Sequence, residues 1–135
     1  MAGPITTASL TWTRDLQFDA RSGQAALVID SSGKAGPSPV ETLALALAGC
    51  MAIDVVDIVQ KGRHPLKGLS ASLTAERAAE PPRRFVKVDL HFVVEGDVPA
   101  AAIERALQLS RDKYCSVWQT LRQDIPFATT YEVRP

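Results

Sequence analysis

The stretch "SPVETLALALAGCMAIDVV", residues 38–56, decides the fold. Ser38 is a favourable residue to precede a helix, Pro39 suits the first helical position, and Glu41 completes a capping box with Ser38. Twelve uncharged residues follow, over 42–53, and they are fewer than the roughly 20 that a membrane-spanning helix needs. We therefore predict a long helix that begins after Ser38 and is buried in the protein core.

Alternating apolar and polar residues on both sides of this helix predict strands. Three precede it, over residues 8–13, 15–20 and 24–30. The patterns after it predict strands over residues 69–76 and 84–94, helices over 97–115 and 116–123, and a final strand over 127–133. The order βββ-α-ββ-αα-β indicates one α+β domain, residues 1–135, in which a mostly antiparallel sheet packs on the long buried helix.

The composition narrows the possible functions. The 135 residues carry a formal net charge of zero, which gives a nucleic-acid role no electrostatic support. The first ten residues, "MAGPITTASL", have neither the basic region nor the apolar run of a signal peptide. We therefore expect a cytoplasmic protein without a membrane partner. In a reducing compartment, two cysteines are more readily free thiols or a redox pair than a structural disulfide. Two scattered histidines argue against a zinc site, and we expect no metal or cofactor.

Each cysteine allows two interpretations from its surroundings. Cys50 is either a small buried hydrophobe or a reactive thiol. Gly49 costs the helix about 1 kcal/mol relative to alanine, and it leaves room beside the thiol. Cys115, in "DKYCSV", is either an inert loop residue or a thiol at a helix N-terminus. There the helix dipole favours thiolate, and Arg111 and Lys113 add positive charge.

These segments resemble the OsmC/Ohr family. Residues 36–56, "GPSPVETLALALAGCMAIDVV", are similar to its central motif, which runs Gly-x-x-Pro-x-Glu, then an apolar helix of small residues, then a cysteine nine positions after the glutamate. Residues 109–117, "LSRDKYCSV", resemble the second-cysteine segment in the form found in the broader OsmC-like branch. The strands between them, in residues 81–99, also match, and the resemblance extends from about Leu10 to Val133.

The resemblance implies a thiol peroxidase that acts in defence against oxidative stress. Cys50 would attack an organic or other hydroperoxide, and Cys115 would resolve the resulting sulfenic acid as a disulfide. Glu41 would orient an arginine from the N-terminal strands. That arginine is preferably Arg21, in the turn "ARSG", and Arg14 is the alternative. A lipoyl-type dithiol or another low-molecular-weight thiol would then reduce the disulfide.

Two other functions stay open at this point. The apolar wall expected from Leu43, Leu45, Leu47 and Met51 suits an alkyl hydroperoxide, but it also suits a binding module for a small hydrophobic ligand. The third function is a purely structural one, with inert cysteines. The rate of Cys50 modification as a function of pH distinguishes these functions, because only the peroxidase requires a thiolate there.

The spacing of Glu41 and Cys50 predicts how the protein assembles. On a straight helix, nine residues correspond to about 13.5 Å of rise and two and a half turns, so the two side chains point to opposite sides. The mechanism implied by the resemblance requires both at one site. We therefore predict an intertwined homodimer in which each site uses residues from both chains. Small residues would let the two long helices approach closely: Ala44, Ala46, Ala48 and Gly49.

Overall fold

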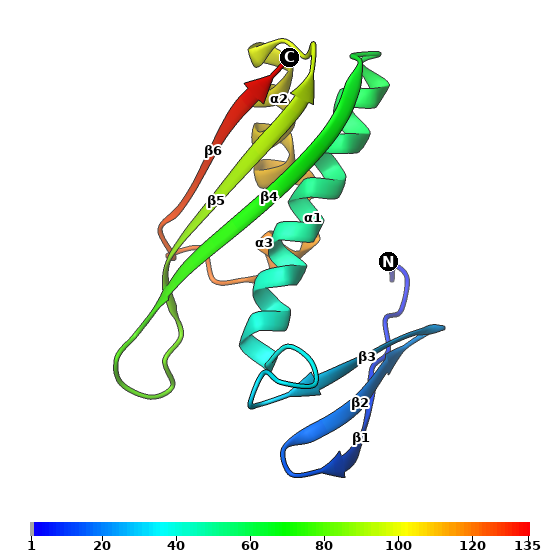
Figure 1. The fold of residues 1–135 in the computed structure, drawn as a ribbon, viewed down its shortest axis with the longest axis vertical. Coiled ribbons are helices and arrows are strands. Elements are labelled where there is room, and N and C mark those ends of the chain that lie inside the picture. The colour runs from blue at the N-terminus through cyan, green and yellow to red at the C-terminus, as the bar shows by residue number, and fades with distance from the viewer. Residues whose placement is uncertain (1) are drawn as a thin grey trace. The chain divides into compact units, whose positions relative to one another are not determined.

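The computed structural model describes residues 2–135, which form two compact units divided between Leu43 and Ala44. The elements in order are β1 (Ser9–Arg14), β2 (Gln17–Ser22), β3 (Ala25–Asp30), α1 (Pro39–Lys61), β4 (Leu66–Arg77), β5 (Phe85–Gly96), α2 (Ala100–Leu109), the π-helical turn η1 (Ser110–Tyr114), α3 (Ser116–Thr120) and β6 (Phe127–Arg134) (Figure 1). The mixed α+β class is confirmed. The expectation of a single domain stays a prediction.

The N-terminal unit contains a three-stranded antiparallel sheet in the order β1-β2-β3. Trp12 pairs with Phe18, and Phe18 pairs with Ile29. Directly opposed residues share a face of a sheet, so these three side chains form an apolar row. Leu10 and Leu27 lie on the same face, which a single chain leaves largely uncovered: Trp12 is 64% exposed and Leu10 is 53% exposed.

A tightly bonded loop leads from β3 into α1. The Asp30 carboxylate accepts hydrogen bonds from the backbone N–H and the hydroxyl of Ser32 and from the backbone N–H of Ala35. The bond from Ala35, followed by those from Ser32, lowers the pKa of Asp30. A side chain at Gly36 would place its Cβ only 2.1 Å from the Val28 carbonyl oxygen. The loop therefore requires glycine at this point.

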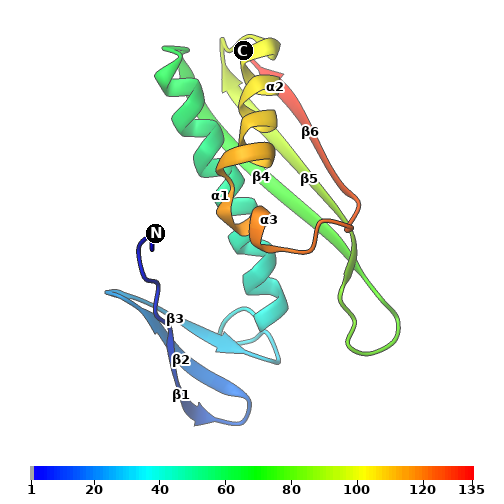
Figure 2. The same cartoon turned by 180° about the vertical axis from the view of Figure 1, so that it is seen from behind.

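The C-terminal unit is built on a second three-stranded sheet, in the order β4-β5-β6. Strands β4 and β5 are antiparallel, whereas β5 and β6 are parallel. The mostly antiparallel pairing is confirmed, because three of the four strand pairs of the described residues are antiparallel. The prediction of a single sheet is wrong, because these strands form two sheets. The chain between β5 and β6 crosses over through α2, η1 and α3, and such a crossover returns the strand in the same direction. Figures 1 and 2 show α1 and α2 on the same face of this sheet.

The core of the C-terminal unit lies between this sheet and the two helices. Alternate residues of β5 are buried toward the helices: Val88, Leu90, Phe92 and Val94. Lys87, Asp89 and His91 occupy the opposite face, as the alternation predicted. There the His91 ring nitrogen Nδ1 lies 2.7 Å from the Thr130 hydroxyl. Helix α1 contributes a stripe of residues four apart: Leu47, Met51, Val55 and Val59.

Helix α1 is not buried on every side within one chain. Leu45 is 63% exposed and Ile53 is 69% exposed. Strands β4, β5 and β6 cover one face of α1, and apolar residues continue around the other faces of the helix. The helix has 23 residues, more than the uncharged stretch alone, and by length and hydropathy it would be able to cross a membrane. Core helices of many proteins have the same length and hydropathy, so these two properties show only that α1 is an apolar helix with an uncovered side.

Replacing Phe92 with alanine is expected to destabilise the fold by about 3–5 kcal/mol, because Phe92 is fully buried and its removal leaves a cavity. Urea denaturation followed by circular dichroism measures this change. Val93→Ala on the opposite face of β5 is the control, and it should cost far less because Val93 is only half-buried. Equal losses for both variants would contradict the assignment of the core face.

Candidate functional site

The two thiols, 65 positions apart in the sequence, meet in the C-terminal unit. Cys50 lies on α1, and Cys115 lies between η1 and α3. Cys50 lies close enough to Cys115 to raise the pKa of its thiol, and both are free thiols. Cys115 is fully buried, whereas Cys50 is half-buried. The fold therefore gives an approaching reagent access to Cys50 before Cys115.

A change of helix type places Cys115. Helix α2 ends at Leu109, and the chain continues as the π-helical turn η1. The Cys115 backbone N–H donates to the Ser110 carbonyl oxygen at 2.7 Å, and the Cys115 backbone is then extended. Its Sγ accepts a hydrogen bond from the Trp118 backbone N–H at 3.3 Å. Cys115 is therefore itself the N-cap of α3.

The environment of Cys115 favours the protonated thiol. Burial raises the pKa of Cys115 to about 11, and the contact with Cys50 and the charge of Asp54 act in the same direction. The hydrogen bond from the Trp118 backbone N–H opposes the shift without cancelling it. The expectation that the helix terminus and nearby cations favour thiolate at Cys115 is wrong, because desolvation outweighs them. The Arg111 guanidinium instead lies over the rings of Trp118 and Phe127.

Glu41 forms the capping box that the sequence predicted. The Ser38 backbone N–H donates to Glu41 Oε1 at 2.9 Å, and the Glu41 backbone N–H donates to Ser38 Oγ at 3.2 Å. The bonds from Ser38 lower the pKa of Glu41, so its side chain is a carboxylate at neutral pH. Helix α1 continues without interruption from Glu41 past Cys50. The role of Glu41 in orienting an arginine at a reacting centre stays a prediction.

The two candidate arginines lie on the N-terminal sheet. Arg21 is on β2, opposite Ser9 of β1 and Ala26 of β3. Arg14 is the last residue of β1. Both side chains are exposed. Their roles beside Cys50, and the choice between them, stay predictions.

The expected apolar wall is divided between two sides of α1. Leu47 and Met51 belong to the buried stripe that faces the C-terminal sheet. Leu45 lies on an exposed side. Gly49 leaves open space within the chain, because a Cβ added there would meet no atom within 4 Å. The room beside Cys50 is therefore open, and it is not filled by another part of the same unit.

Sequence reasoning missed a polar pair beside the cysteines. The hydroxyl of Ser110 donates to Asp54 Oδ2 at 2.7 Å. Ser110 is fully buried, and Asp54 is half-buried one turn beyond Cys50 on α1. A serine among the apolar positions of the second predicted helix was the only available signal, because a buried hydroxyl needs a partner.

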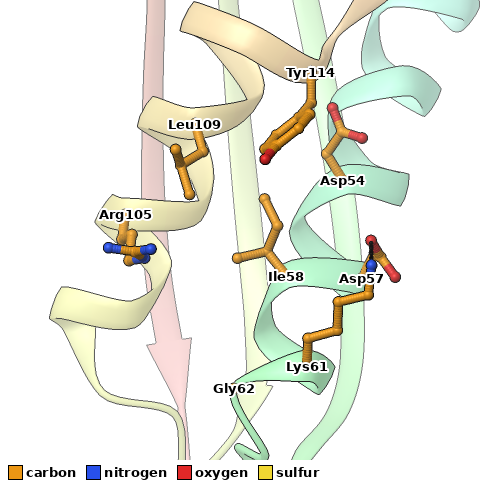
Figure 3. A pocket seen from close by; sticks show the side chains of 8 residues that line it. All are labelled: Asp54, Asp57, Ile58, Lys61, Gly62, Arg105, Leu109 and Tyr114. Carbon is orange, nitrogen blue, oxygen red and sulfur yellow. Dashed lines mark hydrogen bonds and ion pairs between the residues drawn. The ribbon is translucent and has the colours of Figure 1, made fainter.

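The same carboxylate borders a cleft between α1 and α2. The cleft has a volume of about 520 Å³ and is lined by Asp54, Asp57, Ile58, Lys61, Gly62, Arg105, Leu109 and Tyr114 (Figure 3). Lys61 and Asp57 form an ion pair of 2.9 Å along its rim. In Figure 3, Tyr114 and Asp54 lie at the same end of the cleft.

The site is thus a pair of adjacent thiols on an α+β scaffold. Among residues 2–135, no cluster of three or more His, Cys, Asp or Glu side chains is placed to hold a metal ion. The arrangement brings together the two sulfurs that the predicted disulfide between Cys50 and Cys115 requires. The geometry defines a dithiol protein with one accessible and one enclosed sulfur.

Comparisons with known proteins place the chain in a family. Residues 31–130 match the family model described as OsmC-like protein. Protein YhfA of Escherichia coli K12 is 43% identical over 129 residues, covering 93% of this chain and 96% of YhfA. The chain therefore belongs to the OsmC-like family.

Two solved structures show the same fold. A hypothetical protein from Aquifex aeolicus has a TM-score of 0.91 at 23% identity, covering 98% of each chain. An organic hydroperoxide resistance protein OsmC from Legionella pneumophila has a TM-score of 0.71 at 16% identity, covering 98% of this chain and all of its own. At these identities the likeness concerns the fold.

Proposed function

We propose that this protein is a cytoplasmic thiol-dependent peroxidase in which Cys50 attacks a hydroperoxide and Cys115 resolves the product. The observation that carries the proposal is the proximity of a half-buried Cys50 thiol and a fully buried Cys115 thiol. A peroxidatic thiol must be reachable by its substrate, and a resolving thiol must condense with the sulfenic acid before further oxidation. Cys50 is the more accessible thiol and Cys115 the enclosed one, as these two roles require.

The proposed reaction has three steps. The Cys50 thiolate attacks one oxygen of the hydroperoxide and breaks the O–O bond. This forms a sulfenic acid and, once a proton is taken up, releases an alcohol. The Cys115 sulfur then attacks the sulfenic sulfur, forms the disulfide and releases water. A dithiol returns both electrons by thiol–disulfide exchange and leaves as its own disulfide. Cys50 is the accessible sulfur for that exchange.

The substrate and the reductant follow from the chemistry of the pair. An organic hydroperoxide is favoured because the Legionella structure of the same fold is named an organic hydroperoxide resistance protein. A lipoyl-type dithiol or another small thiol is the proposed reductant, since a buried Cys115 excludes a large partner from one side of the disulfide.

The direct test is dithiol-dependent loss of hydroperoxide. Purified protein is incubated with cumene hydroperoxide and dihydrolipoamide, and peroxide consumption is compared with that of hydrogen peroxide under the same conditions. Catalytic turnover that prefers the organic substrate is the expected result. A rate equal to that of dihydrolipoamide without protein would overturn the proposal.

We further propose that the protein acts as a homodimer with sites that include residues of both chains. A single chain exposes large apolar side chains on α1 and on the N-terminal sheet: Leu10, Trp12, Leu27, Leu45 and Ile53. Extended exposed apolar surface is typical of an interface between subunits. The open space at Gly49 allows a second helix to approach α1.

Replacing Ile53 with aspartate is expected to convert the dimer to a monomer, because it places a charge at the centre of the exposed face of α1. Light scattering should show a change from twice the chain mass of 14.5 kDa to the chain mass itself. Ser70→Asp on exposed β4 is the control and should leave the dimer intact. A wild-type chain that is monomeric at micromolar concentration and fully active would exclude the shared site.

Arg21 is proposed to stabilise the Cys50 thiolate. Arg21→Ala is expected to slow peroxide consumption by about 10²-fold, the effect of removing one charged donor from a reacting centre. Arg14→Ala is the matched control on the neighbouring strand and should retain most of the activity. The opposite ranking of the two variants would assign the role to Arg14.

A non-catalytic binding module is the second candidate. The observation in its favour is a shallow apolar hollow of about 380 Å³ beside α1, lined by Ala52, Ile53, Val56, Asp57, Gln60 and Leu69. Binding of a fluorescent hydrophobic probe that persists in a Cys50→Ser variant, without any peroxide turnover in the wild type, would favour this function over the peroxidase.

A further inference from the structure

Helix α1 and the turn η1 meet at two points. Cys50 of α1 lies near Cys115, which follows η1. Asp54 of α1 accepts a hydrogen bond from the hydroxyl of Ser110, the first residue of η1, at 2.7 Å. The two segments therefore meet through two thiols, Cys50 and Cys115, and through two oxygen groups, those of Asp54 and Ser110. Cys50 and Asp54 are one helical turn apart.

The π-helical turn makes this match possible. In an α-helix each residue turns by about 100°, so residues five apart point about 140° away from each other. Ser110 and Cys115 are five apart, and both contact α1. The hydrogen bond of 2.7 Å from the Cys115 backbone N–H to the Ser110 carbonyl closes a wider turn. That turn returns Cys115 to the side of Ser110.

The bond between Ser110 and Asp54 is well placed to hold this turn. Ser110 is fully buried, and a hydrogen bond is stronger where water is excluded. The other side of η1 is anchored by Arg111, which donates to the Phe127 carbonyl at 2.5 Å and lies over the Trp118 ring. Figure 3 shows Tyr114, the residue before Cys115, at the end of the cleft where Asp54 lies.

We propose that Asp54 and Ser110 are positioning residues that hold η1 in its π-helical register and so keep the Cys115 thiol against Cys50. They set how readily the disulfide closes, and they touch neither peroxide nor reductant. The inference rests on the proposed function for its biological meaning. Disulfide closure itself can be measured without any peroxide.

The experiment measures disulfide closure in glutathione buffers. Oxidised glutathione converts the two thiols to a disulfide and becomes two molecules of reduced glutathione. The fraction closed at each ratio gives the equilibrium constant, by mass spectrometry after acid quenching. Ser110→Ala is expected to lower this constant about tenfold or more, since a hydrogen bond to a charged group is lost. Asp54→Asn should remain within about threefold of wild type, because the amide oxygen still accepts from Ser110.

Asp54→Ala separates positioning from a simple charge effect. The Asp54 charge raises the pKa of Cys115, so losing the charge alone would favour the Cys115 thiolate and speed closure. Loss of the hydrogen bond predicts the opposite, slower closure, so the rate of closure distinguishes the two effects. Asp57→Ala, one turn further along α1 in an exposed ion pair, is the matched control and should close like wild type.

A single-turnover measurement adds a readout that general destabilisation would not produce. With one equivalent of hydroperoxide, Ser110→Ala should form sulfenic acid at Cys50 at the wild-type rate and close slowly, and a second equivalent should convert the persisting sulfenic acid to sulfinic acid. Wild-type closure in Ser110→Ala, or closure in Asp54→Asn as poor as in Asp54→Ala, would overturn the proposal. If Ser110→Ala does not fold, the pair Asp54→Asn and Asp54→Ala decides. Impaired closure in a protein without peroxide turnover would refute the peroxidase and leave the positioning role standing.

Discussion

Replacing Cys50 with serine is expected to reduce dithiol-dependent hydroperoxide consumption by about 10³-fold or more, the scale on which loss of a nucleophile acts. A serine hydroxyl is not ionised at neutral pH and forms no sulfenic acid, so neither chemical step can occur. The loss of cumene hydroperoxide with dihydrolipoamide as reductant measures the effect. Serine replaces cysteine with little change in volume, and Cys50 is only half-buried. The variant should therefore fold normally.

Cys115→Ser is the matched control for this result. That variant should still react with one equivalent of hydroperoxide at Cys50, and a second equivalent should then oxidise the sulfenic acid to sulfinic acid because no thiol lies beside it. Turnover should be lost although the first chemical step is preserved. Undiminished turnover in the Cys50→Ser variant would rule out Cys50 as the peroxidatic residue.

In the folded protein, Cys115 is expected to react with iodoacetamide at pH 8 about 10²-fold more slowly than an ordinary thiol. Only the thiolate reacts, and a pKa of about 11 leaves little thiolate at that pH. The rate should rise about tenfold for each unit between pH 8 and pH 10. Mass spectrometry of the Cys50→Ser variant follows this single thiol, and unfolding in urea should restore the ordinary rate. Rapid labelling of folded protein would show that Cys115 is not enclosed.

The same shift predicts a pH dependence of stability. The pKa of Cys115 is raised on folding from 9.0 to about 11. The unfolded chain therefore loses this proton at a lower pH than the folded one. The contribution of Cys115 to the free energy of unfolding is therefore fully present below pH 9, and it is lost as the pH rises toward 11. Urea denaturation at pH 8 and pH 10 should show the decrease for the wild type and a smaller one for Cys115→Ser.

Local patterns predicted most of the elements. The capping box of Ser38 and Glu41 marked the start of α1, because its two hydrogen bonds join residues only three apart. The alternation in β5 separated Phe92 in the core from His91 on the open face, because successive side chains in a strand point to opposite faces. The resemblance to a family also indicated that Cys50 and Cys115 belong together.

Other features depend on residues far apart in the chain. The alternation in β6 is the same whether its neighbour is parallel or antiparallel, so the pairing with β5 was not predictable. The burial of α1 was overestimated because its composition is apolar all round, whereas one sheet covers one side. Nothing near Ser110 in the sequence indicates that its hydroxyl bonds to Asp54, 56 positions away.

Cys115 shows where sequence and tertiary structure divide. The sequence by itself determined that a cysteine stands between two helices, with α3 beginning just after it and cations close by. Only the tertiary structure decided the state of its thiol. Desolvation depends on all the groups that surround the sulfur, and here Cys50 and Asp54 come from a helix more than fifty residues earlier. Local interactions therefore set the elements of this protein, while the packing of distant elements set the chemistry of its second thiol.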